Sequence, residues 1–515
     1  VTNKMVFKGN IDYLNENEIC IRLRATQQNS SVLPSDSLYA IEHDAMDTTF
    51  RSMYQGLYAF MSATKERRDL LLFQREPQFD VALDKQIAEA ADDFTRIALK
   101  AKAAKDYFLL VGPPGTGKTS CALKKMVETF YKEEGAQILL LSYTNRAVDE
   151  ICKALSSIRP EVDFIRVGSE LSCDENYRDH LIENELATCM RRTEVCERIN
   201  RCRILVGTVA SISGKPELFR LKHFDVAIVD EATQILEPQL LGILCAKGEN
   251  GKEGVGKFIL IGDHKQLPAV VLQNSEQSEV YDEALSAVGL KNLKDSLFER
   301  LYRTARQHTD AHRTYDMLCR QARMHPEVAL FANQAFYEGR LLPVGLPHQL
   351  EDSGNINRLS FYPSQPEPMG SSAKTNHSEA KIAARLAATV YKEHSEAFDA
   401  SRTLGIITPY RSQIALVKKE IEALGIPELN QILIDTVERF QGSERDVIIY
   451  SFCVNYPYQL KFLSNLTEED GILIDRKLNV ALTRARKQML LTGVPTLLER
   501  NPLYKSLLKL IESLR

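Results

Sequence analysis

The sequence predicts an α/β protein that contains two layers of parallel sheet in tandem, and two observations lead to this prediction. Short apolar runs of strand length alternate with segments of helical pattern, which is typical of parallel sheets buried on both faces. The alternation occurs twice within 515 residues, a length that accommodates about three domains of ordinary size. The runs lie at 107–111, 138–141, 204–206, 226–229 and 258–261 in the first series, and at 404–407, 432–434, 447–450 and 489–491 in the second.

The segments outside these two series suggest additional elements. A strand-like run at 19–23 lies among polar turns, and apolar residues between 46 and 72 recur at helical spacing. The stretch 157–203 has a helical pattern and no evident strand, and its arginine-rich end at 191–203 could extend a nucleic-acid track or form a solvated helix face. These features predict a β-rich accessory module over 1–45, a helical stalk over 46–80, a first α/β domain over 81–310 with a helical insertion at about 157–203, and a second α/β domain over 311–515.

The composition excludes several classes of protein. Hydrophobic residues at 44% and charged residues at 26% argue against wholesale disorder and collagen-like repeats. A formal net charge of −4 excludes a polycation that coats nucleic acid indiscriminately, so any phosphate-binding surface is local. No apolar run approaches the ~20 residues of a membrane-spanning helix, and residues 1–31 lack a secretory signal pattern. We therefore expect no membrane partner and an intracellular protein, cytoplasmic by default or nuclear. Because the first residue is Val1 and not Met, we also expect a fragment that lacks flanking domains or protein partners.

A glycine-rich loop at 112–119 follows the first apolar run and precedes a helix-like stretch. Its glycines let backbone N–H groups surround the β-phosphate of a nucleotide, Lys118 reaches the β- and γ-phosphate oxygens, and the Thr119 hydroxyl ligates Mg²⁺. An ordinary glycine turn is the alternative, but every position of the motif is filled. We expect ATP and Mg²⁺ as ligands, held by Gly112, Pro113, Gly115, Thr116, Gly117, Lys118, Thr119 and Ser120.

Two further groups follow later strands of the first series. Asp230 and Glu231 close the run at 226–229, so both carboxylates emerge at the carboxyl edge of the sheet. Asp230 can then hold the metal while Glu231 polarises the attacking water, although acidic pairs also cap helices. Gln266 follows the run at 258–261 and could hydrogen-bond the γ-phosphate or the water as a sensor.

Arginines from the second layer could complete the site. Arg323 and Arg484 could reach across the cleft between the layers to the charge that develops on the γ-phosphoryl group, as arginine fingers do. A surface salt bridge is the alternative for each arginine taken alone. With these two, the expected catalytic residues are Lys118, Asp230, Glu231, Gln266, Arg323 and Arg484, and the expected metal ligands are Thr119 and Asp230.

The motifs resemble those of superfamily 1 helicases, specifically the branch of the nonsense-mediated decay helicase and the Okazaki-fragment helicase-nuclease. The resemblance covers roughly 83–493, and its pieces occur in the order of the family. The segments that carry it are 112–119, 142–149, 207–208, 230–234, 262–268, 321–326, 408–413, 435–446 and 479–486.

The resemblance implies two RecA-like P-loop domains with ATP between them, and an N-terminal β-barrel-like accessory module on a helical stalk. It further implies that Gln86 reads adenine and that Glu444 lies near the ribose. Ala322 stands where the family has a tyrosine that packs on the base, so we expect loose nucleotide selectivity. Single-stranded nucleic acid is expected to lie across both domains. Its backbone contacts are assigned to Thr144, Asn145, Thr208, Arg411 and Thr436, for each of which a turn-forming role is an equal alternative.

The resemblance predicts an ATP-dependent helicase or translocase that moves 5′→3′ on single-stranded or tailed nucleic acid and unwinds duplexes as a monomeric motor. DNA is favoured over RNA because the sequence pattern of residues 42–72 is closer to that of the DNA-processing members of the family. Three alternatives remain: an RNA helicase of the same branch, a nucleotide-gated clamp with little unwinding, and a small-molecule phosphotransferase. The phosphotransferase would need an acceptor pocket and a lid, and would not need a second α/β layer.

Overall fold

The computed structural model describes residues 9–23, 38–41, 48–271, 273, 275–308, 313–352, 354, 356–368, 372–469 and 471–514. It divides into two units, Val1–Thr48 and Thr49–Arg515. In the first unit, β1 (Gly9–Leu14) pairs antiparallel with β2 (Ile19–Leu23), which confirms the strand predicted over 19–23. The described residues of this module contain the hairpin and no barrel, and most of the remaining residues up to 45 lie outside the described part.

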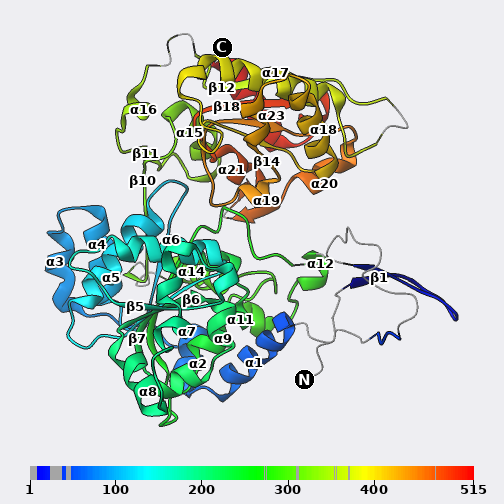
Figure 1. Cartoon of the computed structure of the whole chain (residues 1–515). Helices are drawn as coiled ribbons and strands as arrows, with labels where there is room; N and C mark the ends of the chain where they lie inside the picture. Colours follow the sequence, from blue (N-terminus) through cyan, green and yellow to red (C-terminus); the bar gives the residue numbers. More distant parts are fainter. Residues whose placement is uncertain are drawn as a thin grey trace. The chain divides into compact units, whose positions relative to one another are not determined.

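A first lobe is built on a seven-stranded parallel sheet in the order β5-β6-β4-β7-β8-β3-β9 (Figure 1). All the strands predicted from the first series of apolar runs are confirmed. Their apolar character follows from burial on both faces: Leu109 belongs to one core and Phe108 to another on the opposite side. The strands are β3 (Tyr107–Val111), β4 (Ile138–Ser142), β5 (Phe164–Val167), β6 (Ile204–Thr208), β7 (Phe224–Val229), β8 (Val255–Gly262) and β9 (Tyr315–Met317).

Helices cover the two faces of this sheet. One core takes in α4 (Asp93–Ala103), α5 (Lys124–Tyr131) and α6 (Asn145–Ser156). The other takes in α9 (Val209–Ser213), α11 (Glu237–Leu244) and α14 (Leu297–Gln307). The sheet is therefore covered on both sides, as the uninterrupted apolar strands require.

The edge strand β5 corrects the prediction that 157–203 contains no strand. It pairs in parallel with β6 at the edge of the sheet. Its four residues include Arg166, which interrupts the apolar pattern by which the other strands are recognised. The buried Arg166 guanidinium forms an ion pair with Asp149 of α6, a contact that only the folded chain provides.

The opposite edge strand, β9, pairs with β3 and extends the first lobe beyond the boundary predicted at residue 310. Its central residue Asp316 lies 2.5 Å from an Arg96 nitrogen and 2.8 Å from Lys100 Nζ, both on α4. A charged residue at the centre of a three-residue strand conceals the strand in the sequence. The first lobe accordingly continues to Met317.

Two helices occupy the segment where a stalk is predicted, α1 (Thr48–Ser62) and α2 (Lys65–Leu71). The prediction extends the stalk to residue 80, whereas α2 ends at Leu71. Leu70 and Leu71 are buried in the core of the first lobe, and the Arg67 guanidinium donates to the carbonyl of Val255 over 2.5 Å. α2 is thus a part of the first lobe and not a free-standing stalk.

A second lobe is built on a five-stranded parallel sheet in the order β12-β18-β15-β13-β14. It confirms all the strands predicted from the second series and adds β12 at one edge. One of its cores includes α17 and α18, and the other includes α15, α21 and α23. The strands are β12 (Leu359–Pro363), β13 (Leu404–Ile407), β14 (Leu433–Asp435), β15 (Arg445–Ser451) and β18 (Ala485–Gly493), and the helices are α15 (Pro326–Phe336), α17 (His377–Glu393), α18 (Arg411–Glu422), α21 (Arg476–Leu482) and α23 (Pro502–Ser513).

An antiparallel hairpin of β16 (Leu466–Glu469) and β17 (Ile472–Asp475) precedes α21 and contacts the first lobe. Glu469 on this hairpin forms an ion pair with Arg306 of α14 at 3.2 Å. Among the helices of the described ranges, none is both long and apolar enough to span a bilayer.

Candidate functional site

Three of the predicted groups meet at the carboxyl edge of the first sheet. The glycine-rich loop follows β3, the acidic pair follows β7, and the segment with Gln266 follows β8. These strands are neighbours in the order β7-β8-β3, so their carboxyl ends lie side by side. The amide of Gly112 donates to the carbonyl of Gly262 over 2.9 Å, which ties the loop to the end of β8.

The loop is shaped so that the Lys118 side chain folds back over its first glycine. A Cβ atom added at Gly112 would lie 2.1 Å from Lys118 Cγ, so a larger residue would displace the lysine. Gly115 and Gly117 have φ values of +73° and +77°, a left-handed conformation that L side chains rarely adopt. Lys118 Nζ lies 3.5 Å from Glu231 Oε1, so the lysine already faces an anionic group.

Thr119 and Asp230 form an oxygen-rich pair suited to a divalent cation. The Thr119 hydroxyl donates to Asp230 Oδ2 over 2.5 Å. Burial and the neighbouring charge of Glu231 raise the pKa of Asp230 to about 6. A bound Mg²⁺ would offset this cost by favouring the ionised carboxylate, so the residues present fit the metal expected from the sequence.

Glu231 differs from Asp230 in its charge environment. Burial tends to raise its pKa, but the charges of Lys118 and Arg484 and the hydrogen bond from Gln234 together outweigh burial and lower it. Its backbone has a φ of +52°, an uncommon conformation for a residue other than glycine. Two adjacent carboxyls with opposite shifts suit different tasks, a metal ligand and an ionised base.

Gln266 lies between the two lobes. Its Nε2 donates to Asp263 Oδ2 over 2.7 Å, and its Oε1 accepts a hydrogen bond from Arg484 Nη2 over 3.2 Å. Arg484 is 2% exposed, and its burial, together with the charge of Arg323, lowers its pKa to about 9. The structure therefore brings the predicted sensor and one predicted arginine into direct contact.

The second arginine, Arg323, packs directly on the phosphate loop. A Cβ atom added at Gly115 would lie 2.4 Å from Arg323 Cβ, and the amide of Ala322 donates to the carbonyl of Gly115 over 2.8 Å. Arg323 Nε donates to Glu444 Oε2 over 2.5 Å, and the two residues belong to one cluster at the cleft. Both predicted arginines of the second lobe thus lie at the nucleotide-binding edge of the first.

Three of the remaining nucleotide-binding predictions have different environments. The Thr116 hydroxyl donates to the carbonyl of Pro113 over 2.7 Å and closes the turn of the loop. Ser120 is exposed on the helical turn Lys118–Leu123 that follows the loop. Gln86 is exposed on α3 (Asp84–Ala88), and within the described ranges no hydrogen bond or ion pair joins it to the loop.

A buried hydrogen-bond chain, which the sequence motifs did not predict, connects the lobes behind Gln266. The Tyr337 hydroxyl donates to Asp263 Oδ2 over 2.7 Å and accepts from Asn479 Nδ2 over 2.8 Å. Asn479 Nδ2 also donates to the carbonyl of Lys265 over 2.7 Å. Tyr337 looks like an ordinary core aromatic at the end of an apolar helix, so the sequence offers no signal for its hydroxyl. For Asn479 the sequence does offer a signal, because this residue begins the motif at 479–486.

The residues predicted to contact nucleic acid begin helices at the carboxyl ends of neighbouring strands. Thr144 follows β4 and Thr208 is the last residue of β6, and each hydroxyl accepts a backbone hydrogen bond as the N-cap of its helix. Asn145 and Arg411 are the first residues of α6 and α18, and Arg411 is exposed. Thr436 precedes α19 (Val437–Phe440) after β14. Capping thus accounts for two hydroxyls, while the helix amino termini remain available to anions.

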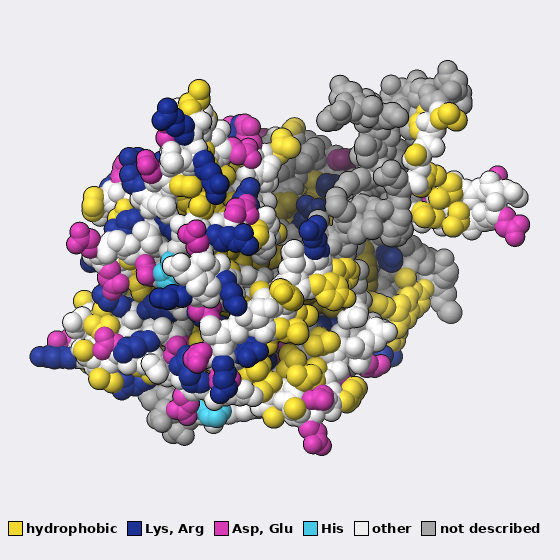
Figure 2. All heavy atoms as spheres, turned by 90° about the horizontal axis from the view of Figure 1, so that it is seen from below, with side chains coloured by type: hydrophobic (Ala, Val, Ile, Leu, Met, Phe, Trp, Pro, Cys, Tyr) yellow, Lys and Arg dark blue, Asp and Glu magenta, His cyan; other side chains and the backbone are white. Residues whose placement is uncertain are grey.

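The arginine-rich segment 191–203 lies away from these residues. Its helix α8 (Arg192–Arg201) ends just before β6 begins, at the amino edge of the sheet, whereas Thr208 lies at the carboxyl edge. Arg198 pairs with Asp163 at 3.1 Å and with Glu185 at 2.7 Å. Figure 2 shows cations and anions interspersed on the face seen from below. The segment therefore behaves as a solvated helix face and does not extend the predicted track.

Two family models, each described as an AAA domain, match the chain, one over residues 86–195 and 184–274 and the other over 293–496. The DNA replication ATP-dependent helicase/nuclease DNA2 of Bos taurus is 27% identical over 98% of this chain and 48% of its own length. The protein of the same name from Homo sapiens is 28% identical over 93% of this chain and 46% of its own length. DNA polymerase alpha-associated DNA helicase A of Saccharomyces cerevisiae is 26% identical over 79% of this chain and 65% of its own length.

These matches agree with the motifs in order and position. The chain spans about half the length of the helicase/nucleases it matches, and the alignment covers nearly all of the chain. On this basis the chain belongs to the ATP-hydrolysing superfamily 1 helicases, in the branch that includes the DNA2 helicase/nucleases.

Proposed function

We propose that this chain is a monomeric motor that hydrolyses ATP to move 5′→3′ along single-stranded DNA and to separate duplexes. The observation that supports it best is that Arg323 and Arg484 of the second lobe lie at the phosphate loop and Gln266 of the first. A nucleotide held at the loop would contact both lobes. Its cleavage would then change how the lobes hold each other, which is what a motor requires.

The hydrolysis step divides among five residues. Lys118 binds the phosphate oxygens, and Thr119 and Asp230 are placed to hold Mg²⁺, which when bound neutralises charge on the β- and γ-phosphates. Glu231 is ionised by the neighbouring lysine and accepts a proton from the attacking water. Arg484 donates to the charge that develops on the γ-phosphoryl group.

Gln266 gives the site its link to the second lobe. In this arrangement Oε1 of Gln266 and the γ-phosphate compete for the same Arg484 guanidinium. Arrival of the phosphate therefore rearranges the contact between Gln266 and Arg484. Asp263 and Tyr337 carry that rearrangement to α15 of the second lobe.

The nucleic-acid strand is proposed to cross the carboxyl ends of β4, β6, β13 and β14, where Thr144, Asn145, Thr208, Arg411 and Thr436 begin helices. Backbone N–H groups at helix amino termini bind phosphates without regard to sequence, which suits a translocating motor. DNA is preferred because the relatives that cover most of this chain carry names that refer to DNA replication. The 5′→3′ direction follows from the branch alone.

ATP turnover with and without oligo-dT tests the motor. We expect the oligonucleotide to stimulate turnover, with Lys118→Ala as an inactive control. Turnover that ignores oligonucleotides and rises with a small phosphate acceptor would replace the motor with a phosphotransferase.

Strand separation on 5′-tailed and 3′-tailed duplexes, built in DNA and in RNA, tests direction and substrate. The proposal expects unwinding of the 5′-tailed DNA duplex. Nucleotide-dependent strand binding without separation would identify a clamp, and unwinding of RNA alone would identify the RNA-specific alternative.

A further inference from the structure

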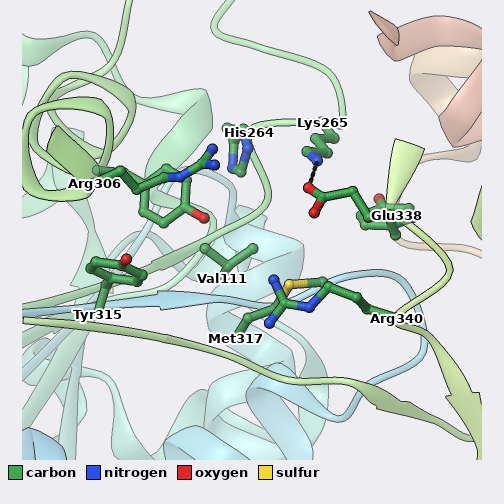
Figure 3. Close-up of a pocket in the computed structure, with 10 residues that line it drawn as sticks. Val111, His264, Lys265, Arg306, Tyr315, Met317, Glu338 and Arg340 are labelled. Carbon is green, nitrogen blue, oxygen red and sulfur yellow. Dashed lines mark ion pairs between the residues drawn. The ribbon is translucent and has the colours of Figure 1, made fainter. Parts of the chain in front are cut away.

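A cavity of about 180 Å³ lies where the two lobes meet, next to the phosphate loop (Figure 3). Val111, which directly precedes Gly112, contributes to its wall, together with Met317 at the end of β9. The ring of Tyr337 forms another part of the wall, and the Tyr337 hydroxyl is bonded to Asp263. The cavity is therefore adjacent to the chain of contacts around Gln266, but none of the roles proposed above uses it.

The charged groups around the cavity are mainly cationic. Lys265, Arg306 and Arg340 line it, and Glu338 is the one carboxylate among its lining residues. Lys265 Nζ lies 3.8 Å from Glu338 Oε1, a loose ion pair. Arg340 is exposed and forms no ion pair with any residue that the structure describes. Figure 3 shows the Arg306, Lys265 and Arg340 side chains arranged around the space.

The pKa of Glu469 reflects the positive charges around it. It lies 3.2 Å from an Arg306 nitrogen and 2.9 Å from His264 Nε2. Burial tends to raise its pKa, but the close approach of His264 and the charges of His264, Lys265 and Arg306 prevail and lower it to about 2. The cations beside this cavity thus stabilise Glu469 as an anion.

The surroundings of the His264 ring are a further observation at this cavity. The side chain is 7% exposed and lines the cavity. Both ring nitrogens are buried without a hydrogen-bond partner among the residues described, although Nε2 lies 2.9 Å from Glu469 Oε2. A buried ring nitrogen without a partner calls for an explanation, and an N–H group at Nδ1 could donate to an anion in the cavity.

The size of the cavity restricts the ligand. Its volume is below the roughly 300–1,000 Å³ of pockets for drug-sized molecules, so it accommodates a phosphate group and not a nucleotide. Arginine donors match the oxygens of a phosphate in geometry as well as in charge. The turn that precedes Arg340 is left-handed at two residues, Glu338 and Gly339, which have φ values of +56° and +72°.

We propose that this cavity is a second phosphate site, which takes either inorganic phosphate released by hydrolysis or one phosphate of the nucleic-acid backbone. Arg306, Arg340 and His264 are its donors. Because Arg340 comes from the second lobe and the other two from the first, a bound phosphate holds the lobes together. Only the origin of the phosphate rests on the proposed function, since binding itself needs no turnover.

The test measures thermal unfolding of the whole chain with a saturating non-hydrolysable ATP analogue and Mg²⁺, so that the γ-phosphate position is filled. Inorganic phosphate is then titrated against potassium chloride at equal ionic strength. We expect phosphate to raise the Tm of the wild-type chain, and Arg340→Ala to weaken the apparent phosphate affinity about tenfold. The matched control is Arg500→Ala, an exposed arginine between α22 (Pro495–Leu498) and α23 that lies outside the cavity.

Identical phosphate responses in Arg340→Ala and Arg500→Ala would overturn the proposal, as would a wild-type chain that does not respond to phosphate. Adding oligo-dT separates the two sources: loss of the phosphate response assigns the site to the strand backbone, and persistence assigns it to free phosphate. If the wild-type chain hydrolyses no ATP but still shows the Arg340-dependent response of Tm to phosphate, the proposed motor function is wrong and the phosphate site stands.

Discussion

Replacing Tyr337 with phenylalanine should weaken the coupling between nucleic-acid binding and ATP turnover while leaving the nucleotide site intact. The ring stays in place, and only the hydroxyl that joins Asp263 to Asn479 is lost. Burial raises the pKa of Tyr337 well above its usual value, so the group is a neutral donor at any working pH. The change therefore removes one hydrogen bond between the lobes, from Tyr337 to Asp263, and one within the second lobe, from Asn479 to Tyr337, without removing a charge.

The magnitude follows from what each partner retains. Asp263 Oδ2 keeps the hydrogen bond from Gln266 Nε2 at 2.7 Å, and Asn479 Nδ2 keeps the carbonyl of Lys265 at 2.7 Å. Neither group is left without a partner, so the loss belongs at the low end for a hydrogen bond to a charged group, about 1.5 kcal/mol. That value corresponds to about tenfold in the equilibrium between closed and open lobes.

The assay compares ATP turnover of Tyr337→Phe and wild type over a range of oligo-dT concentrations. We expect stimulated turnover to fall about tenfold, with the KM for ATP changed less than about threefold. Tyr504→Phe is the matched control, because its buried hydroxyl also donates to a carboxylate, Asp475 at 2.8 Å, but within the second lobe. Full stimulation in Tyr337→Phe, or an equal loss in Tyr504→Phe, would refute the coupling role.

Three further changes test separate parts of the structure. Glu231→Gln should abolish turnover and retain ATP binding, measured by nucleotide titration, and near-normal turnover would remove its role as base. Arg484→Ala should lower turnover by about 1,000-fold and change nucleotide affinity less than about tenfold, and complete loss of binding would count against an arginine finger. Burial raises the pKa of Glu379 from 4.5 to about 7, so the folded state binds the proton more tightly and wild-type stability falls as pH rises between these values. In urea unfolding, Glu379→Gln should therefore gain up to about 3 kcal/mol over wild type at pH 8 and much less at pH 5, whereas equal gains would exclude this cause.

The local features of the site could be predicted from the sequence because each consists of consecutive residues. Neighbouring residues are enough to recognise the glycine-rich loop and the acidic pair after 226–229. The strands of both sheets are recognised from short continuous apolar runs. Strand order then brought these groups together, since parallel strands place their carboxyl ends at one edge. The arginines of the second lobe were predicted from their motifs, and the structure places Arg323 on the loop and Arg484 beside Gln266.

The edge strands and the stalk could not be predicted in the same way. Arg166 and Asp316 interrupt the apolar pattern of β5 and β9, and their ionic partners lie elsewhere in the chain. The end of α2 is fixed by burial of Leu71 against the first sheet, which a helical periodicity does not reveal. In β5 and β9 an ionic contact compensates for a charged residue that the local pattern disfavours, and in α2 a packing contact sets where the helix ends.

The sequence by itself determined the fold class, the phosphate-binding loop and the family, because these are encoded in short ordered segments. Only the tertiary structure decided that Tyr337 joins Asp263 to Asn479, and that His264 and Arg340 share a cavity. The physical reason is distance along the chain. A hydroxyl bonded to a carboxylate on the other lobe, or a cation opposite a buried imidazole, produces no periodic pattern in the sequence. Such contacts exist only once the two lobes have packed against each other.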